Sequence, residues 1–480
     1  MSECSVLHLI EQGEYDAALD LLETWPNSTS RTFYRATCHL SKPCPDYVLA
    51  ESGFSSLLGL VDDLELQKLV RLRLAISFHG QNRLVQALLA LVPLLKGYHS
   101  NGGTRLAYQN YGNLCFEMGL AHHWLACCRK AGDLFHDRPL DQQAAQFRYQ
   151  RGLAYLMTGQ FEKAWSDLEY RFQAGCAVEP SLALPRLRSL MVHDTGGRLL
   201  LYGDQGLGDI LFSFRFVPLV RDLFRSISLI CPPSLVAFSK VCGLFDDVFV
   251  VDQLDEELFD VWSPINSLPC LLDVSSISEV PLQQIQISND SIPEWCQSLK
   301  VSSLSRPLVA LNWHGGSDKE SLFSAGIRER SFPFGEYEAV SALSDCSLLS
   351  VQVGHTARQA IDSHLSKHFL PQQYYFDQEP ADFLLTASVL KQVDLLITND
   401  TSVAHLGGVL GVPTWVVLKC HPYWQWGDTS EFNSWYPSVR CFRQKKPFEW
   451  GGAMENLDAA LREHLLASVQ TKFTPPVLDL

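Results

Sequence analysis

Apolar and polar positions alternate most clearly between Asp394 and Leu418. Leu395–Thr398 is a short apolar run typical of a buried strand, and the polar residues of Asn399–Ser402 are types that cap helices. Val403–Leu410 predicts a short helix whose adjacent glycines allow it to lie close to a sheet, and a second apolar strand follows. The pattern predicts a βαβ unit.

Predicted strands and helices alternate in the same way over residues 196–472. Strands are predicted at Arg198–Tyr202, Ser226–Cys231, Val248–Val251, Phe259–Trp262, Leu308–Trp313 and Leu348–Val353. Helices are predicted at Ile210–Phe224 with a kink at Pro218, Phe334–Leu343, Ala381–Val393 and Asn456–Val469. The polar segment Gln283–Ser305 predicts a linker between two α/β domains, residues 196–300 and 306–472.

Residues 1–175 have helical periodicity instead. A G-x-aromatic-x-x-A pattern occurs at Gly13–Ala18 and again at Gly159–Ala164, with looser copies at Gly80 and Gly119. This pattern is typical of the turn in a tetratricopeptide-like repeat, and repeat arrays hold a partner protein or mediate self-association. The alternative is a helical bundle in which these glycines and alanines coincide by chance.

The formal charge of −15 and a pI near 5.4 argue against nucleic-acid or anionic-membrane partners, which require a basic surface. The longest apolar stretch, Leu88–Leu95, contains Pro93 and is too short to span a membrane. Glu11 and Glu14 interrupt any signal-peptide core, so a cytoplasmic protein is expected. Fourteen cysteines without CxxC pairs predict reduced thiols and no zinc site.

Candidate chemistry follows the first strand of the βαβ unit. Ligands collect at the carboxyl ends of parallel strands, where a helix N-terminus attracts phosphate. Thr401 and His405 share a helix face there, after Asp400. An alternative stays open, in which Asp400 or Asn399 only caps the helix and His405 is a buried core histidine.

A second polar turn follows the first strand of the first α/β domain. Its glycines have the order G-x-x-G-x-G, and Pro232 and Pro233 stand where a ribose-binding acid is expected, so the turn does not predict NAD binding. Asp209 at its end is a candidate general base or, alternatively, a helix cap. The sequence contains no Asp-x-Asp pair, which favours chemistry without a metal.

Several motifs occur in the order of a known family. They are YGDQGLGDILFSFRFVPLV, SPINSLP, LNWHGG with RSFPF, ITNDTSVAHLGGVLGVPTWVVL, HPYWQWG and SWYPSVRCFRQ. Over roughly residues 200–470 the chain resembles family 9 glycosyltransferases, the heptosyltransferase-like group, in a tetratricopeptide-fused form. The resemblance implies a GT-B fold, with two Rossmann-like domains after an all-α repeat domain.

The resemblance also implies roles for individual residues. Asp209 matches the catalytic carboxylate of an inverting, metal-independent transfer from a nucleotide sugar. Thr401, Ser402 and His405 are expected to bind the diphosphate. Asp400 is expected to accept hydrogen bonds from sugar hydroxyls.

Further donor-side and loop residues follow from the same motifs. Arg330, with Arg328 nearby, is expected to lie beside the phosphates. Trp313 and His314 are expected at the donor nucleotide or sugar. The loop residues expected near the cleft are Gln205, Gly206, Gly208, Trp424 and Trp426, although the aromatic residues could instead belong to the core.

The sequence therefore predicts a glycosyltransferase without a cofactor, with a nucleotide-sugar donor that could resemble ADP-heptose. The acceptor is a hydroxyl on a glycan, lipid or protein, and the repeats are expected to hold a protein partner. The rival hypothesis is a non-catalytic repeat scaffold with a degenerate transferase fold. Retention of Asp209 together with Asp400–His405 favours the enzyme.

Overall fold

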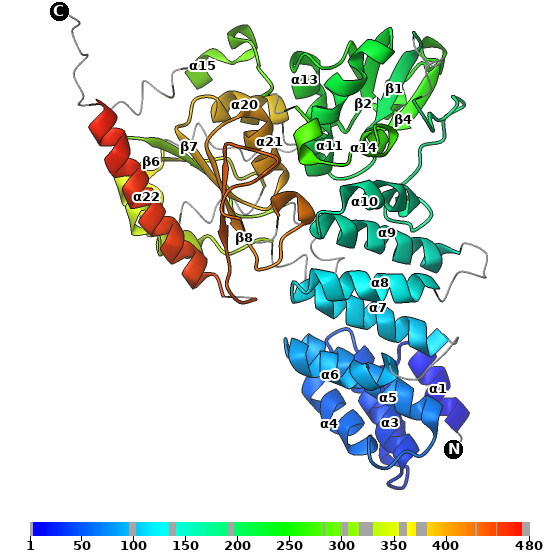
Figure 1. Cartoon of the computed structure of the whole chain (residues 1–480). Helices are drawn as coiled ribbons and strands as arrows, with labels where there is room; N and C mark the ends of the chain where they lie inside the picture. Colours follow the sequence, from blue (N-terminus) through cyan, green and yellow to red (C-terminus); the bar gives the residue numbers. More distant parts are fainter. Residues whose placement is uncertain are drawn as a thin grey trace, which may run out of the picture. The chain divides into compact units, whose positions relative to one another are not determined.

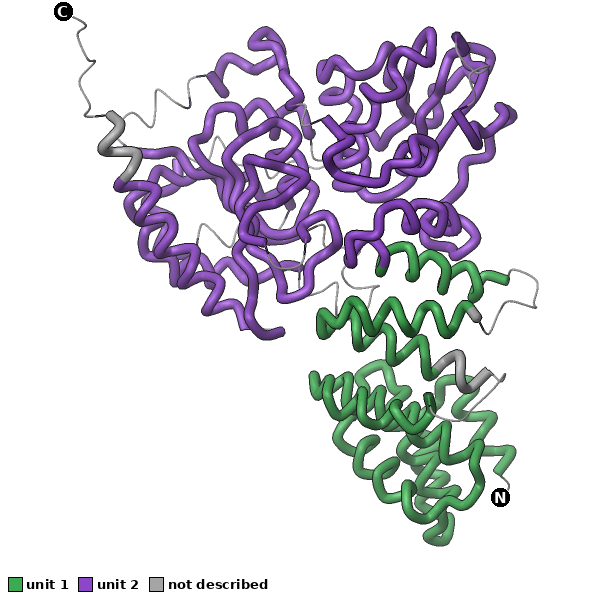
Figure 2. Tube along the Cα trace, in the orientation of Figure 1, with its two compact units in different colours: residues 1–154 green, residues 155–480 purple. Residues whose placement is uncertain are grey.

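The computed structural model of the chain divides into two compact units, residues 1–154 and 155–480 (Figures 1 and 2). It describes residues 3–95, 102–133, 141–190, 196–281, 284–297, 299, 306–315, 330–354, 362–370, 382–427, 430–447 and 449–472. Each unit is considered by itself.

The described residues of the first unit are helical and contain no strand. The helices are α1 (Glu3–Glu11), α2 (Tyr15–Glu23), α3 (Thr29–Ser41), α4 (Tyr47–Leu57), α5 (Leu64–Gly80), α6 (Leu84–Leu95), α7 (Gly102–Glu117), α8 (Ala121–Asp133) and α9 (Gln142–Met157), the last of which crosses the boundary. Consecutive helices pack as pairs, α1 with α2 through α7 with α8. Their apolar faces form the interior, for example Phe54, Val70 and Leu91.

The turns within these pairs explain the glycine pattern. Gly13 and Gly119 have φ angles of 77° and 69°, in the left-handed region that suits glycine. Between α5 and α6 the left-handed residue is Asn82, with φ of 59°, and Gly80 is the last residue of α5. The assignment of Gly80 to the turn was therefore wrong, because the side chain of asparagine also tolerates this conformation. The tetratricopeptide assignment itself stays a prediction.

The second unit contains two all-parallel sheets. The first has the strand order β3-β2-β1-β4, formed by β1 (Arg198–Tyr202), β2 (Ser226–Ile230), β3 (Asp247–Phe249) and β4 (Val261–Pro264). Its helices are α11 (Leu207–Ser213), α12 (Val217–Val220), α13 (Pro233–Val241) and α14 (Leu268–Leu271). Short 3-10 turns flank α12, so the predicted helix 210–224 is broken into segments around Pro218.

The second sheet has the order β6-β5-β7-β8-β9. Its strands are β5 (Leu308–Leu311), β6 (Ser347–Ser350), β7 (Leu395–Asn399), β8 (Thr414–Leu418) and β9 (Val439–Arg443), and its helices are α15 (Glu294–Gln297), α19 (Gly335–Glu338), α20 (Phe383–Leu390), α21 (Ser402–Leu410) and α22 (Gly451–Lys472). Every residue of β7 and β8 is buried, as expected for a parallel sheet covered on both faces. The α/β prediction is confirmed.

The βαβ prediction is confirmed at β7, α21 and β8. Gly407 brings α21 close to the sheet, because a Cβ there would lie 2.9 Å from the Leu396 side chain. Gly411 ends the helix with φ of 68°, and its N–H bonds back to Gly407 and Gly408 carbonyls. The small residues therefore set both the depth and the length of this helix.

Two elements differ from the expectations. Strand β9 was not predicted, since its five residues VRCFR lack a clear alternation of apolar and polar positions. Helix α22 packs on the second sheet through Met454, Leu457 and Leu461. It runs from Gly451 to Lys472 and so extends beyond the predicted Asn456–Val469 at both ends.

The helix that follows the boundary belongs with the sheets. This helix, α10 (Phe161–Leu168), continues into the 3-10 turn η1 (Glu169–Arg171). The indole of Trp165 donates to the Val274 carbonyl at 2.8 Å, and Arg171 pairs with Asp204 beside β1. Compact packing therefore ends the first unit before the predicted limit of residue 175.

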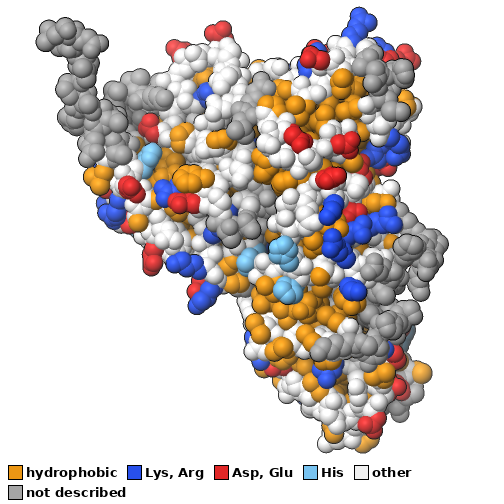
Figure 3. Space-filling model, viewed as in Figure 1, with side chains coloured by type: hydrophobic (Ala, Val, Ile, Leu, Met, Phe, Trp, Pro, Cys, Tyr) orange, Lys and Arg blue, Asp and Glu red, His pale blue; other side chains and the backbone are white. Residues whose placement is uncertain are grey.

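None of the described helices has the length and apolar character needed to cross a membrane. The structure joins none of the cysteines in a disulfide. On the face shown in Figure 3, acidic and basic side chains lie interspersed with apolar ones.

Candidate active site

The loop after β1 places Asp209 in the first turn of α11. The helix begins at Leu207, and its cap is Gly206, which has no side chain. Asp209 is therefore not the helix cap that the sequence left open as an alternative. Its Oδ1 accepts a hydrogen bond from Gln425 Nε2 at 3.0 Å, across from the second sheet. A Cβ at Gly206 would lie 3.1 Å from Oδ2, so the glycine keeps space beside the carboxylate.

The surroundings of Asp209 favour the neutral carboxyl. Burial raises its pKa to about 6, while the hydrogen bond from Gln425 acts in the opposite direction. Asp204 and Asp400 raise the pKa further, and the positive charge of Arg330 lowers it. Desolvation is the largest of these effects. A carboxylate with a pKa near 6 is a suitable general base at neutral pH.

Asp400 lies at the carboxyl end of β7. Its Oδ1 accepts a hydrogen bond from the indole Nε1 of Trp426 at 2.8 Å, and its Oδ2 is buried without a partner. The cap of α21 is Thr401, so neither Asp400 nor Asn399 caps the helix as the alternative supposed. Trp426 thus fixes one oxygen of Asp400 and leaves the other for a ligand.

The N-terminus of α21 presents polar groups to the same region. The hydroxyl of Thr401 donates to Asn312 Oδ1 at 3.2 Å. Its side chain accepts no hydrogen bond from the helix backbone, so the first-turn N–H groups, including that of Ser402, are not capped by it. Uncapped N–H groups at a helix N-terminus favour anions.

Arg330 supplies the positive charge. Its Nε is buried without a partner, and its carbonyl accepts a hydrogen bond from Asn399 Nδ2 at 2.8 Å. Its positive charge lowers the pKa of both Asp209 and His405. Arg328 lies outside the described residues.

Four residues of these loops and strand ends each have a buried polar atom without a hydrogen-bond partner. These atoms are Arg330 Nε, Asn399 Oδ1, Asp400 Oδ2 and Gln425 Oε1. One is a cationic donor and three are acceptors, and unpartnered buried polar atoms are costly in a native fold. The set is complementary to a ligand that combines an anionic oxygen with hydroxyl groups.

The environment of His405 differs from the one expected for a residue that binds the diphosphate. Its Nδ1 lies 3.0 Å from the Tyr436 hydroxyl, and its ring centre lies 4.7 Å from that of Trp426. Burial, aided by the charges of Arg215 and Arg330, lowers its pKa to about 3, so the ring is neutral. This geometry favours the alternative of a buried, hydrogen-bonded histidine over a phosphate ligand.

Most of the predicted aromatic residues belong to the packing between elements. The ring centre of Trp424 lies 5.0 Å from that of Phe212 in α11 and 5.8 Å from that of Trp165 in α10. The side chain of Trp313 is fully buried, with its ring centre 4.7 Å from that of Phe334. Both rings pack among other aromatic residues, and the expected positions of Trp424 near the cleft and of Trp313 at the donor stay predictions.

The remaining predicted residues lie around the strand ends. The backbone N–H of His314 donates to Gln352 Oε1 at 2.9 Å, and its side chain is partly exposed. Gln205 is partly exposed in the loop that precedes α11. Gly208 faces His405, because a Cβ there would lie 2.7 Å from His405 Cδ2.

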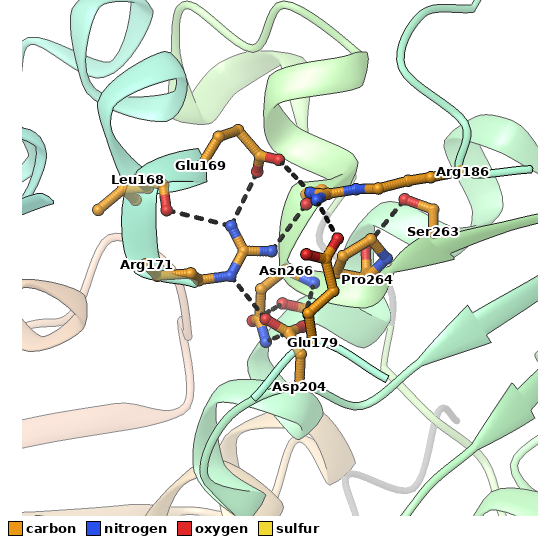
Figure 4. A network of polar contacts seen from close by, with 11 residues as sticks. Leu168, Glu169, Arg171, Glu179, Arg186, Asp204, Ser263, Pro264 and Asn266 are labelled. Atoms are coloured by element: carbon orange, nitrogen blue, oxygen red, sulfur yellow. Dashed lines mark hydrogen bonds and ion pairs between the residues drawn. The ribbon is translucent and has the colours of Figure 1, made fainter. Parts of the chain in front are cut away.

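Sequence reasoning missed two contributions. Gln425, which holds Asp209, lies between two tryptophans, and a polar residue in that setting could have been noticed. Asp204 is the second, and Figure 4 shows its carboxylate beside Arg171. Arg171 Nε donates to Asp204 Oδ2 at 2.6 Å, and Asn266 Nδ2 donates to Asp204 Oδ1 at 3.0 Å. This buried pair anchors the loop that carries Asp209.

Among the described side chains, no group of three or more His, Cys, Asp or Glu residues is arranged to hold a metal ion. The expectation of chemistry without a cofactor stays a prediction.

Comparison with known proteins gives distant similarities. No family model matches the chain. The chain is similar to Protein FlbA of Caulobacter vibrioides, with 23% identity over 382 residues, which cover 74% of this chain. These residues span only 61% of the length of that curated relative.

The chain is also similar to solved structures, at lower sequence identity. The E. coli ADP-heptose lps heptosyltransferase II has 12% identity and a TM-score of 0.39, covering 56% of this chain and 99% of that one. The glycosyl transferase family 9 protein from Veillonella parvula has 14% identity and a TM-score of 0.38, with coverage of 58% and 100%. The O-GlcNAc transferase of Thermobaculum terrenum has 11% identity and a TM-score of 0.28, with coverage of 93% and 94%. Scores and identities this low carry no inference about chemistry.

Proposed function

We propose that the chain is an inverting glycosyltransferase of the GT-B type that transfers a sugar from a nucleotide-sugar donor to a hydroxyl acceptor. The proposal rests on the motifs that resemble family 9 and on the chemistry of the candidate site. ADP-heptose, the best-known donor of that family, is one candidate donor, and the acceptor hydroxyl belongs to a glycan, lipid or protein.

The observation that carries the proposal is the set of four unpartnered polar atoms beside Asp209. A nucleotide sugar has hydroxyl groups that donate to Asp400 Oδ2, Asn399 Oδ1 and Gln425 Oε1, and phosphate oxygens that accept from Arg330 Nε. Such a ligand would satisfy both kinds of atom. Neither a purely cationic nor a purely apolar ligand would do so.

Asp209 would act as the general base. The acceptor oxygen attacks the anomeric carbon as its proton moves to the Asp209 carboxylate, and the bond from that carbon to the diphosphate oxygen breaks. The nucleoside diphosphate leaves with the bonding electrons, and the configuration at the anomeric carbon inverts. No metal is assigned a role.

The departing diphosphate would gain negative charge during this step. Arg330 and the first-turn N–H groups of α21, including that of Ser402, would stabilise the charge. Asp400 would hold the sugar hydroxyls through Oδ2, because its other oxygen already accepts from Trp426. The two carboxylates would therefore have different roles. Asp209 would accept the proton of the acceptor, and Asp400 would bind the sugar of the donor.

The helical first unit would contribute to acceptor selection. Tetratricopeptide-like repeats present surfaces that bind peptides or proteins. A protein acceptor, or a partner that delivers the acceptor, would fit this arrangement.

Donor binding is tested first by thermal unfolding of the full-length chain with a panel of nucleotide sugars. A ligand at a hundred times its Kd should stabilise the fold by about 2.7 kcal/mol. The stabilisation should disappear in Arg330→Met and persist in Arg306→Met, since Arg306 lies away from the site and bonds the Ser344 carbonyl. No stabilisation by any nucleotide sugar would favour the scaffold hypothesis.

Catalysis is tested with Asp209→Asn. Turnover should fall by roughly a hundred- to ten-thousand-fold, as expected for a lost general base, while donor Kd stays within about twofold. The wild-type kcat/KM should rise with pH through about 6, since the base must be ionised. Asp222→Asn, an exposed substitution in the same domain, is the matched control. Undiminished turnover in folded Asp209→Asn would disprove the role of Asp209.

A further inference from the structure

A cavity of about 300 Å³ lies apart from the candidate active site. Residues from both halves of the second unit line it, among them Arg215, Pro218, Gln284, Val409, Trp435 and Ser438. None of the four unpartnered atoms of the active site belongs to its lining. Its volume is at the lower end for pockets that hold small ligands.

The cavity contains a cationic group with no counter-ion. Arg215 forms no ion pair with any carboxylate in the described part of the chain, and burial lowers its pKa. Its Nε donates to the Phe212 carbonyl at 2.9 Å, and its Nη1 donates to the Trp435 carbonyl at 3.0 Å. Arg215 is half-buried at the wall of the cavity, and a partly desolvated positive charge that the described residues leave without a carboxylate partner favours a compensating anion.

Aromatic rings supply only part of that compensation. The guanidinium carbon lies 4.1 Å from the ring centre of Phe212, 4.4 Å from that of Tyr436 and 5.2 Å from that of Trp435. These contacts favour a cation but accept none of its N–H groups as a carboxylate would. Of the five N–H donors of a guanidinium, two go to the carbonyls and one to the Tyr436 hydroxyl.

Ser438 is a second polar residue of the cavity lining. The hydroxyl oxygen of Ser438 is buried and has no hydrogen-bond partner. An oxygen anion would accept from both the remaining guanidinium donors and this hydroxyl. Pro218 and Val409 supply apolar surface beside them.

We propose that this cavity binds a small anion through Arg215 and Ser438. The ligand class is a carboxylate or phosphate group, and the apolar lining accommodates a compact apolar remainder. The lining comes from Phe214, Arg215 and Pro218, residues 242–244, Pro281, and residues 284–286, 408–409 and 435–438, so a bound anion would bridge the two sheet-bearing parts of the second unit. The site is independent of the proposed transfer reaction.

The test uses the full-length chain with inorganic phosphate and benzoate as probes, titrated by thermal unfolding at constant ionic strength. At least one probe should raise the Tm of wild type in a saturable manner. Arg215→Met should weaken its apparent Kd at least tenfold. Arg221→Met, which removes an exposed arginine paired with Asp246, should leave it unchanged. If Arg215→Met does not fold, Arg215→Lys keeps the charge without the planar fork and should weaken binding at least threefold.

Other outcomes would overturn the proposal. If neither probe gives a saturable Tm shift at concentrations up to about 50 mM, the cavity binds neither group with a Kd of about 1 mM or tighter. A shift that survives Arg215→Met but is lost in Arg330→Met would assign the anion to the active site. The two probes distinguish a phosphate ligand from a carboxylate ligand. Because the readout is binding, failure here leaves the transferase proposal intact.

Discussion

Asp209 illustrates how one side chain is tuned by groups distant in sequence. Its partner Gln425 comes from the second sheet, while Gly206 leaves space beside the carboxylate. Asp204 and Asp400 both raise its pKa, and Arg330 lowers it. The result is a carboxylate that ionises near neutrality, which suits a base but destabilises the fold.

The destabilisation gives a prediction for Asp209→Asn. Its carboxyl ionises near pH 6 in the folded chain and near 3.8 as an unperturbed group, so the wild-type free energy of unfolding should fall as pH rises from about 4 to 6. Asparagine cannot ionise and still accepts from Gln425. At pH 8 the variant should therefore be more stable than wild type by about 1 to 3 kcal/mol, with the difference vanishing near pH 4. Urea denaturation at both pH values measures this.

Asp222→Asn again provides the control, because an exposed carboxylate should change the free energy of unfolding by less than about 0.5 kcal/mol at either pH. A less stable Asp209→Asn at pH 8 would mean that the carboxylate stabilises the fold and is not desolvated as inferred.

Helices α11 and α21 approach each other closely, and this contact brings the candidate base toward the donor side. Gly208 of α11 lies against the ring of His405 in α21. One turn further along the same face of α21, Gly408 lies against Tyr436, since a Cβ there would be 2.6 Å from the Tyr436 ring. Small residues therefore fix the separation of the two helices.

Gly208→Ala should push the two helices apart. The new Cβ would lie 2.7 Å from His405 Cδ2, a side chain held by Tyr436 and Trp426. We expect a loss of about 1 to 3 kcal/mol in the free energy of unfolding and weaker donor binding. Urea denaturation and calorimetry measure the two effects.

Gly452→Ala in α22 is the matched control, because a Cβ at Gly452 meets no atom within 4 Å. Alanine should be neutral or stabilising there by up to about 1 kcal/mol. If both variants behaved alike, close packing at Gly208 would not control the approach of the helices.

At the scale of the whole molecule, the segment that follows the boundary between the two units, α10 and η1, packs against the part of the chain that contains the first sheet. Arg171 is almost fully buried, and its Nη2 donates to Ser267 at 2.7 Å in addition to its pair with Asp204. Burial opposes its charge, but Asp204 and Glu169 together raise its pKa. The pair is a buried ionic contact whose disruption leaves an uncompensated carboxylate.

This arrangement predicts different behaviour for two fragments. Fragment 141–480 keeps α9 to η1 and should unfold with nearly the free energy of the sheet-bearing unit in the full chain. Fragment 176–480 lacks Trp165 and Arg171 and should be less stable by about 3 to 5 kcal/mol or more. Urea denaturation of both fragments measures the difference.

Full-length Arg171→Met should reproduce most of that loss, whereas Arg198→Met, which breaks the exposed pair with Asp260, should leave the free energy of unfolding nearly unchanged. Equal stability of the two fragments would show that α10 and η1 do not support the first sheet.

The sequence by itself determined the local elements. Largely continuous apolar runs specified β1, β5, β7 and β8, because strands buried on both faces have no polar alternation. The helical N-terminal region followed from its periodicity and from glycines such as Gly13 and Gly119, which adopt left-handed turns. The same patterns placed Asp209 at the end of the turn after one strand and Asp400 directly after another. Local chemistry dictates these features.

Only the tertiary structure decided which of these residues face a ligand. It buried Trp313, Trp424 and His405, and it joined Gln425 to Asp209 across 216 positions. Hydrophobic burial is non-directional, so a pattern of apolar residues states that a tryptophan is buried but not against what. Hydrogen bonds and buried charges depend on atoms brought within about 3 Å by the packing of distant elements, and that packing has no signature in local sequence.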